Sequence, residues 1–208
     1  QPVKASDKEI IDKYMKKANS RSCDMSFAAV YLWKDFYLLE YTVCEDMLIF
    51  RTTEDGSSYS FPIGDASPEK ALLALEAHCK ENEEPLKLHC VYRENEAWLE
   101  EHMPGKFEIE FDRDSADYIY ECEKLIGLKG KKFHGKKNHV NKFIKTYDWA
   151  YEKITDDNID DCLAMLYKWK EINCEPGNIE KHAEACVSEN ALREREFLGL
   201  KGGLIRAD

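Results

Sequence analysis

Apolar and polar residues alternate along the first half of the chain in short patterns that predict helices and strands. Between Ile10 and Ala18 apolar residues recur at three- and four-residue intervals, which predicts an amphipathic helix. Ser6-Asp-Lys-Glu9 has the form of a capping box, so this helix is expected to begin there. Residues 36–43 and 47–53 are rich in aromatic and aliphatic side chains, and the short polar stretch between them predicts a β-hairpin.

The same patterns predict a strand-rich arrangement up to about residue 111. The further elements expected here are a strand at 59–63 after an Asp55-Gly56 turn, a helix from Ala71 to about Lys80, a strand at 86–92, a helix at 95–103 and a half-buried strand at 107–111. The resulting order, α-β-β-β-α-β-α-β, is typical of an α/β (α+β) protein.

The second half of the chain has a different pattern, rich in helices. The change follows the acidic stretch 112–117, so we predict two domains, residues 1–114 and 115–208. The expected elements are helices at 118–128 and from Phe133 to about Tyr147, a strand at 149–154, a helix capped by residues 155–158, a helix at 179–198 and a strand beginning at Leu204. Because that last strand has no following partner, the pattern favours a second domain that is incomplete in this chain.

Composition limits the class of protein. The 208 residues are 43% apolar, 12% aromatic and 34% charged, which is typical of a folded globular chain. The sequence contains no apolar run of about 18 residues, so no membrane-spanning segment is predicted. The N-terminus does not resemble a signal peptide. A cytoplasmic location is the expectation. The sequence does not define an oligomeric state.

The eight cysteines are scattered singly and include no C-x-x-C pair. They fall mostly at apolar positions of the predicted elements, so we interpret them as reduced thiols of the core. A disulfide framework is the alternative, but a chain of this length does not need one, and a metal site would require closer spacing.

The charge of the chain is distributed unevenly. The formal net charge is −11, which argues against non-specific binding of the whole chain to nucleic acid or anionic membrane. Residues 129–145, however, hold seven lysines and no acid, so the remaining residues carry a formal charge of −18. The positive potential is therefore local.

This basic segment is the part of the chain with the most distinctive chemistry. A helix that begins near Phe133 would align donors along one ridge, namely His134, Asn138, Asn141 or Lys142, and Lys145. Such a ridge suits a phosphate or a carboxylate, although a solvated lysine face is the simpler interpretation. His134 and His139 would lie about 140° apart around the helix, too far to ligate one metal together, so no metal site is predicted.

The segment also resembles a known family. Asp117-Tyr-Ile-Tyr and the stretch from Leu125-Ile-Gly-Leu-Lys-Gly to Asn141-Lys-Phe resemble the signature of the DUF2156 proteins, which are similar to the C-terminal domain of phosphatidylglycerol lysyltransferase. The resemblance extends to residues 36–64 and 198–206 and so covers most of the chain. It implies tandem acyl-CoA N-acyltransferase (GNAT-like) domains with mixed, mainly antiparallel sheets and flanking helices.

The resemblance also implies an activity. It suggests acyl or aminoacyl transfer from an anionic donor, either acyl-CoA or aminoacyl-tRNA, with tRNA as the expected partner. His134 or His139 would be the proton carrier, and the anion-binding residues would be Lys131, Lys132, Lys136, Lys137, Asn138, Asn141 and Lys142. Two alternatives remain open: a non-catalytic module that binds anions or RNA, and a structural segment whose lysines pair with the protein's own acids.

Overall fold

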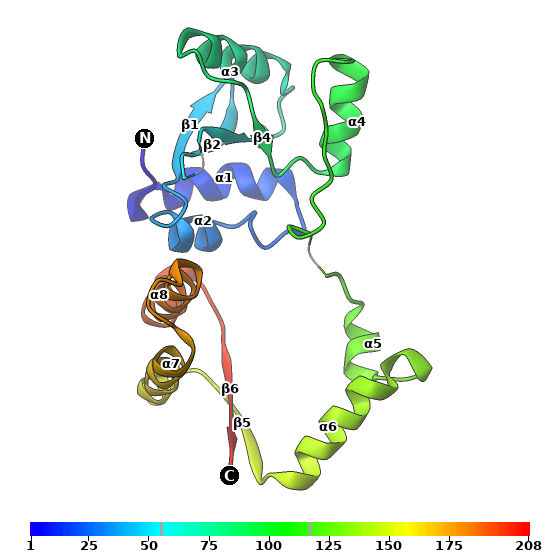
Figure 1. Ribbon diagram of the computed structural model, residues 1–208, viewed down its shortest axis with the longest axis vertical. Helices are drawn as coiled ribbons and strands as arrows, with labels where there is room; N and C mark the ends of the chain where they lie inside the picture. Colours follow the sequence, from blue (N-terminus) through cyan, green and yellow to red (C-terminus); the bar gives the residue numbers. More distant parts are fainter. Residues whose placement is uncertain (55, 117) are drawn as a thin grey trace. The chain divides into compact units, whose positions relative to one another are not determined.

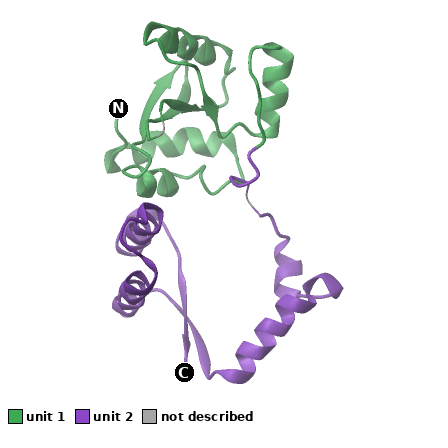
Figure 2. Cartoon of the chain, in the orientation of Figure 1, with its two compact units in different colours: residues 1–111 green, residues 112–208 purple. Residues whose placement is uncertain are grey.

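The computed structural model describes residues 1–54, 56–116 and 118–208, which form two compact units, residues 1–111 and 112–208 (Figure 2). Asp55 of the predicted turn and Asp117 of the quoted signature lie outside the described residues. Each unit is considered by itself. Unit 1 combines helices with a sheet, and unit 2 consists of helices and a two-stranded ribbon (Figure 1).

Unit 1 is built around a four-stranded mixed sheet. Its strands follow the order β1-β2-β3-β4, with the first two pairings antiparallel and the last parallel. The elements are η1 (Ala5–Asp7), α1 (Lys8–Ala18), α2 (Phe27–Trp33), β1 (Glu40–Cys44), β2 (Met47–Thr52), β3 (Ser58–Ser60), α3 (Glu69–Glu81), β4 (Leu88–His89) and α4 (Arg93–His102). The α/β class and the mixed, mainly antiparallel sheet are therefore confirmed for this unit.

Strand β2 lies at the centre of the unit 1 core. Met47 and Ile49 pack with α3, whereas Leu48 and Phe50 alternate to the opposite face of the strand. Helix α1 also contacts β2 (Figure 1). All four side chains are at most 5% exposed. A second cluster joins α3 to α4 through Leu72. Burial on both faces explains why the apolar pattern predicted this hairpin from the sequence.

Several predicted elements of unit 1 are wrong in part. The first helix begins at Lys8, and the capping box predicted at Ser6–Glu9 does not form. Instead, the Asp7 carboxylate accepts a hydrogen bond from the Lys4 backbone N–H at 2.8 Å. Helix α2 was not predicted, and the strand expected at 86–92 contains only residues 88–89. No strand forms at 107–111, which pairs with none of the described strands, and Phe111 is 77% exposed.

Unit 2 contains a pair of helices, a ribbon of two strands and the basic segment. Its elements are α5 (Cys122–Gly127), η2 (Lys131–Phe133), α6 (His134–Thr146), β5 (Trp149–Lys153), α7 (Ile159–Asn173), α8 (Ile179–Arg193), α9 (Arg195–Leu198) and β6 (Gly203–Ala207). β5 and β6 pair antiparallel over five residues each. The helix predicted at 118–128 is thus shorter than expected, and the one predicted at 179–198 divides at Glu194.

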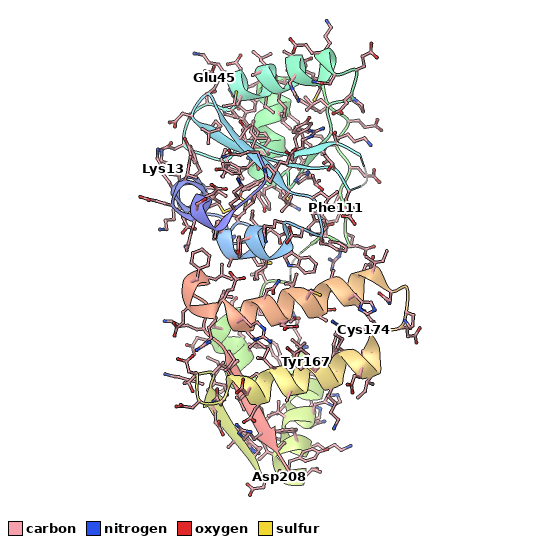
Figure 3. The ribbon with its side chains drawn as sticks, turned by 90° about the vertical axis from the view of Figure 1, so that its left-hand side faces the viewer. Lys13, Glu45, Phe111, Tyr167, Cys174 and Asp208 are labelled. Atoms are coloured by element: carbon pink, nitrogen blue, oxygen red, sulfur yellow. The ribbon has the colours of Figure 1, made fainter. Side chains whose placement is uncertain are left out.

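Polar contacts hold the elements of unit 2 together at their surfaces. The Tyr167 hydroxyl of α7 donates to Glu189 of α8 at 2.8 Å, and Figure 3 shows Tyr167 on the helix that ends near Cys174. Arg206 of β6 binds Glu152 at 2.8 Å and Asp161 at 2.6 Å. The Arg206 hydrogen bond holds the pKa of the Glu152 carboxyl below its ordinary value.

The eight cysteines are not a set of core residues. Cys79 and Cys162 are buried, whereas four of the others are exposed, namely Cys23, Cys90, Cys122 and Cys186. The prediction of a common place in the core is therefore wrong. It assumed that apolar spacing alone decides burial, whereas Cys23 and Cys90 of unit 1 lie outside its helices and strands, and Cys122 and Cys186 lie on exposed positions of unit 2 helices.

No described helix is both long and apolar enough to cross a membrane.

Candidate functional site: the basic segment of unit 2

The basic segment folds as a sharp turn, one turn of 3-10 helix and the 13-residue helix α6. Phe133 is buried at the start of α6. At its other end the Phe143 ring lies 5.1 Å from that of Tyr147 and 6.3 Å from that of Trp149, measured between centroids. These aromatic contacts attach the helix to its unit at both ends. Apart from half-buried Phe143, every residue of α6 is exposed.

One face of α6 carries only donors. With about 100° between successive residues, six side chains fall within an arc of about 140°. We call this set the donor ridge; its members are His134, Lys137, Asn138, Asn141, Lys142 and Lys145. Asn141 and Lys142, left as alternatives by spacing alone, both belong to it. Lys136 and His139 lie on the other side of the helix.

The lysines of the basic segment make no ion pair with any residue that the structure describes. Lys136 lies over the ring of Tyr120, with its ammonium 5.9 Å from the centroid. Lys124 of the neighbouring helix α5, in contrast, is bound to Glu121 at 2.7 Å. Within the described residues, therefore, the structural alternative of lysines neutralised by internal acids has no support.

An open depression of about 490 Å³ lies where the turn meets α6. We call it the Lys131 depression; it is lined by Leu128, Lys129, Gly130, Lys131, His134 and Lys137. The depression thus brings together three of the predicted site residues, Lys131, His134 and Lys137. It does not include the other predicted residues, which are Lys132, Lys136, Asn138, His139, Asn141 and Lys142.

Four residues at this site were not among the predicted site residues. Leu128, Lys129 and Gly130 line the depression, and Tyr120 contacts Lys136. Lys129 was visible within the lysine run, and Tyr120 within the quoted signature. Their positions depend on a backbone turn at 128–130 that periodicity does not reveal.

The site offers cationic and amide donors rather than a metal-binding arrangement. Among the described residues, no three His, Cys, Asp or Glu side chains gather in a group suited to a metal ion. Neither His134 nor His139 is hydrogen-bonded to a carboxylate of the described chain. What the arrangement can do chemically is bind a polyanion and place an imidazole next to it.

Comparisons with known proteins agree with the fold and point to one family. The sequence model described as "Phosphatidylglycerol lysyltransferase, C-terminal" matches residues 15–208. A crystal structure of a conserved protein of unknown function from Bacteroides thetaiotaomicron VPI-5482 is similar over 100% of this chain and 71% of that chain, with a TM-score of 0.90 and 31% identity.

A curated relative matches a shorter region. It is the uncharacterized protein MYCGA3080 of Mycoplasmoides gallisepticum (strain R(low / passage 15 / clone 2)), 33% identical over 63 residues. The match covers 29% of this chain and 20% of the relative, so the chain spans about a fifth of the length of that protein.

Proposed function

Because this chain belongs to the phosphatidylglycerol lysyltransferase C-terminal family, we propose that it takes part in acyl or aminoacyl transfer, with the basic segment 129–145 holding an anionic donor. The match suggests a transferase-like role. The donor and the residues that bind it are our proposal, and it depends on the lysines that remain unpaired among the described residues. Unpaired ammonium groups gathered in an otherwise acidic chain favour binding of phosphates.

The shape of the donor ridge favours aminoacyl-tRNA over acyl-CoA as the donor. Lys137, Lys142 and Lys145 are distributed over nine residues of helix, so the first and the last are about 12 Å apart at 1.5 Å per step. A row of this length suits a polymer with successive phosphates, because each lysine of the row can meet a different phosphate. We therefore place the tRNA backbone along the donor ridge.

His134 is the better candidate for proton transfer. It belongs to the donor ridge and also lines the Lys131 depression, whereas His139 lies on the other side of α6. In acyl transfer an acceptor amine or hydroxyl attacks the donor carbonyl, and its proton must leave to a base. His134 would accept that proton and return it to the ribose oxygen of the tRNA, which leaves as a hydroxyl when the ester bond of the donor breaks, while the lysines hold the donor.

The test is to incubate the protein with tRNAs or acyl-CoA that carry a labelled acyl group, and to follow label transfer. We expect transfer from aminoacyl-tRNA and a loss of about 10²-fold or more in rate for His134→Ala. His139→Ala is the matched control and should retain the rate. Equal loss in both variants, or no loss in either, would contradict the role given to His134.

A non-catalytic role in binding is the second candidate. It is favoured by one observation, namely that no described carboxylate orients either imidazole. It predicts that aminoacyl-tRNA binds with the same dependence on the donor ridge but keeps its acyl group. Binding without label transfer in the experiment above would select this alternative.

A further inference from the structure

The Lys131 depression differs from the rest of the basic segment because four basic residues converge on one hollow. The donor ridge spaces its lysines along the helix, but Lys129, Lys131 and Lys137 line a single hollow together with His134. Three lysines and one histidine that line a single hollow of about 490 Å³ raise the local density of positive charge there. Such a site prefers a compact, multiply charged anion over a singly charged one.

The backbone turn explains this convergence. Leu128 ends α5 in the left-handed conformation, with φ 42° and ψ 40°. Gly130 follows with φ 91° and ψ 165°, a region that is essentially accessible only to glycine. The two residues reverse the chain between α5 and α6, and Lys129 and Lys131 lie on either side of Gly130. A Cβ at Gly130 would meet no atom within 4 Å, so conformation rather than space requires glycine here.

The charge of the ligand group distinguishes the possible occupants. A phosphate monoester carries about −1.5 to −2 at neutral pH, whereas each phosphodiester of a nucleic-acid backbone carries a single negative charge. Spaced lysines are sufficient for diesters. Converging lysines gain most from the second charge of a monoester, because each added charge interacts with all three ammonium groups.

We propose that the Lys131 depression is a binding subsite for a terminal phosphate monoester of the donor. This inference rests on the proposed function, since it assigns one end of the anionic donor to the depression and its backbone to the donor ridge. Two donors contain such a group: RNA with a 5′-phosphate, and coenzyme A with its 3′-phosphate. The subsite recognises the chemistry that they share.

The experiment compares probes that differ only in this phosphate. Binding of a short RNA with a 5′-phosphate is measured against the same RNA with a 5′-hydroxyl, and coenzyme A against dephospho-coenzyme A. We expect the phosphorylated member of one pair to bind about tenfold more tightly, as for one charge-assisted contact. Lys129→Gln with Lys131→Gln should abolish that difference.

Lys142→Gln with Lys145→Gln is the matched control. It removes the same charge from the far end of the donor ridge, so it should weaken both RNA probes and preserve the ratio between them. A preference in the RNA pair identifies an RNA end as the ligand, and a preference in the coenzyme pair identifies a nucleotide cofactor.

Two results would overturn the proposal in different ways. The first is that the phosphorylated and unphosphorylated probes bind equally in both pairs, while the Lys142 and Lys145 variant still weakens RNA binding. This result would exclude the subsite and leave the proposed function intact. No binding of any probe overturns the proposed function, and the subsite with it.

Discussion

The two units of this protein use their apolar side chains differently. Among the described residues, 19 buried apolar side chains belong to unit 1 and six to unit 2. Of the 24 large apolar side chains that are exposed, 17 lie in unit 2. Unit 1 therefore has the properties of a scaffold with its own core, whereas unit 2 keeps an open surface.

The lysines of the basic segment also differ from lysines of unit 1 that form ion pairs. In unit 1, Lys17 is bound to Asp65 at 2.6 Å and Lys106 to Glu76 at 2.5 Å. In unit 2, no lysine between 129 and 145 pairs with a described acid. The formal net charge of −11 is therefore a poor guide to function, because it does not reveal the lysines of the basic segment that remain available for a ligand.

The largest effect should come from the core of unit 1. Leu72 is 1% exposed and packs with Phe61 and Leu99, so Leu72→Ala should lower the free energy of unfolding by about 3 kcal/mol. Ile126 of unit 2 is 79% exposed, and Ile126→Ala should change that free energy by less than about 0.5 kcal/mol. Urea denaturation followed by circular dichroism measures both. Similar losses in the two variants would break the contrast between the units.

A smaller effect is expected at alkaline pH from a buried tyrosine of unit 1. Tyr59 is 3% exposed, and burial raises its pKa to about 12. The unfolded chain loses this proton near pH 10 and the folded chain only near 12, so stability falls as pH rises between these values, by about 2–3 kcal/mol. Tyr59→Phe removes the hydroxyl, which has no hydrogen-bond partner among the described residues. Between about pH 10 and 12, the unfolding free energy of Tyr59→Phe should therefore fall less than that of the unchanged protein. An equal fall in the two proteins would show that Tyr59 does not titrate as inferred.

The availability of the unit 2 lysines predicts a change in binding rather than in folding. Lys142→Glu with Lys145→Glu should weaken tRNA binding by about tenfold or more at low salt, since two phosphate contacts are lost. Lys70→Glu with Lys80→Glu, on exposed positions of α3 in unit 1, makes the same change in net charge and is the control. If both variants weaken binding equally in a filter-binding titration, the positive potential is not local.

The smallest effect is expected at the ribbon of unit 2. Arg206 is 46% exposed where it binds Glu152 and Asp161, so Arg206→Gln should cost less than about 1 kcal/mol of stability. The loss should shrink further in high salt, because these charges are accessible to solvent. Thermal unfolding at two salt concentrations measures it. A loss as large as that of Leu72→Ala would mean that unit 2 depends on this network for its fold.

Periodicity predicted the parts of the fold that are stabilised locally or buried on a regular face. The hairpin of β1 and β2 and the helix α3 follow from apolar spacing, and so does the donor ridge. Helix α2 was missed because Phe27–Trp33 is short and apolar on every side, so it shows no period. The strand at 107–111 was wrong because alternation describes a strand only when a partner is present.

Some residues of the Lys131 depression could be predicted from the sequence, but the hollow that they line could not. The lysine run and His134 were recognised from residue types, but their convergence depends on Leu128 in a left-handed conformation. A leucine rarely adopts positive φ, so no local rule places a reversal there. The tertiary context of α5 and α6 overrides the local preference.

The central claim is that the lysines of the basic segment bind an anionic donor while those of unit 1 do not. Acetylation of each lysine, followed by mass spectrometry with and without tRNA, measures this at every position in one experiment. We predict that tRNA protects Lys131, Lys137, Lys142 and Lys145 and leaves Lys70 and Lys80 unchanged. Unchanged labelling of the basic segment, or equal protection of both units, would contradict the account.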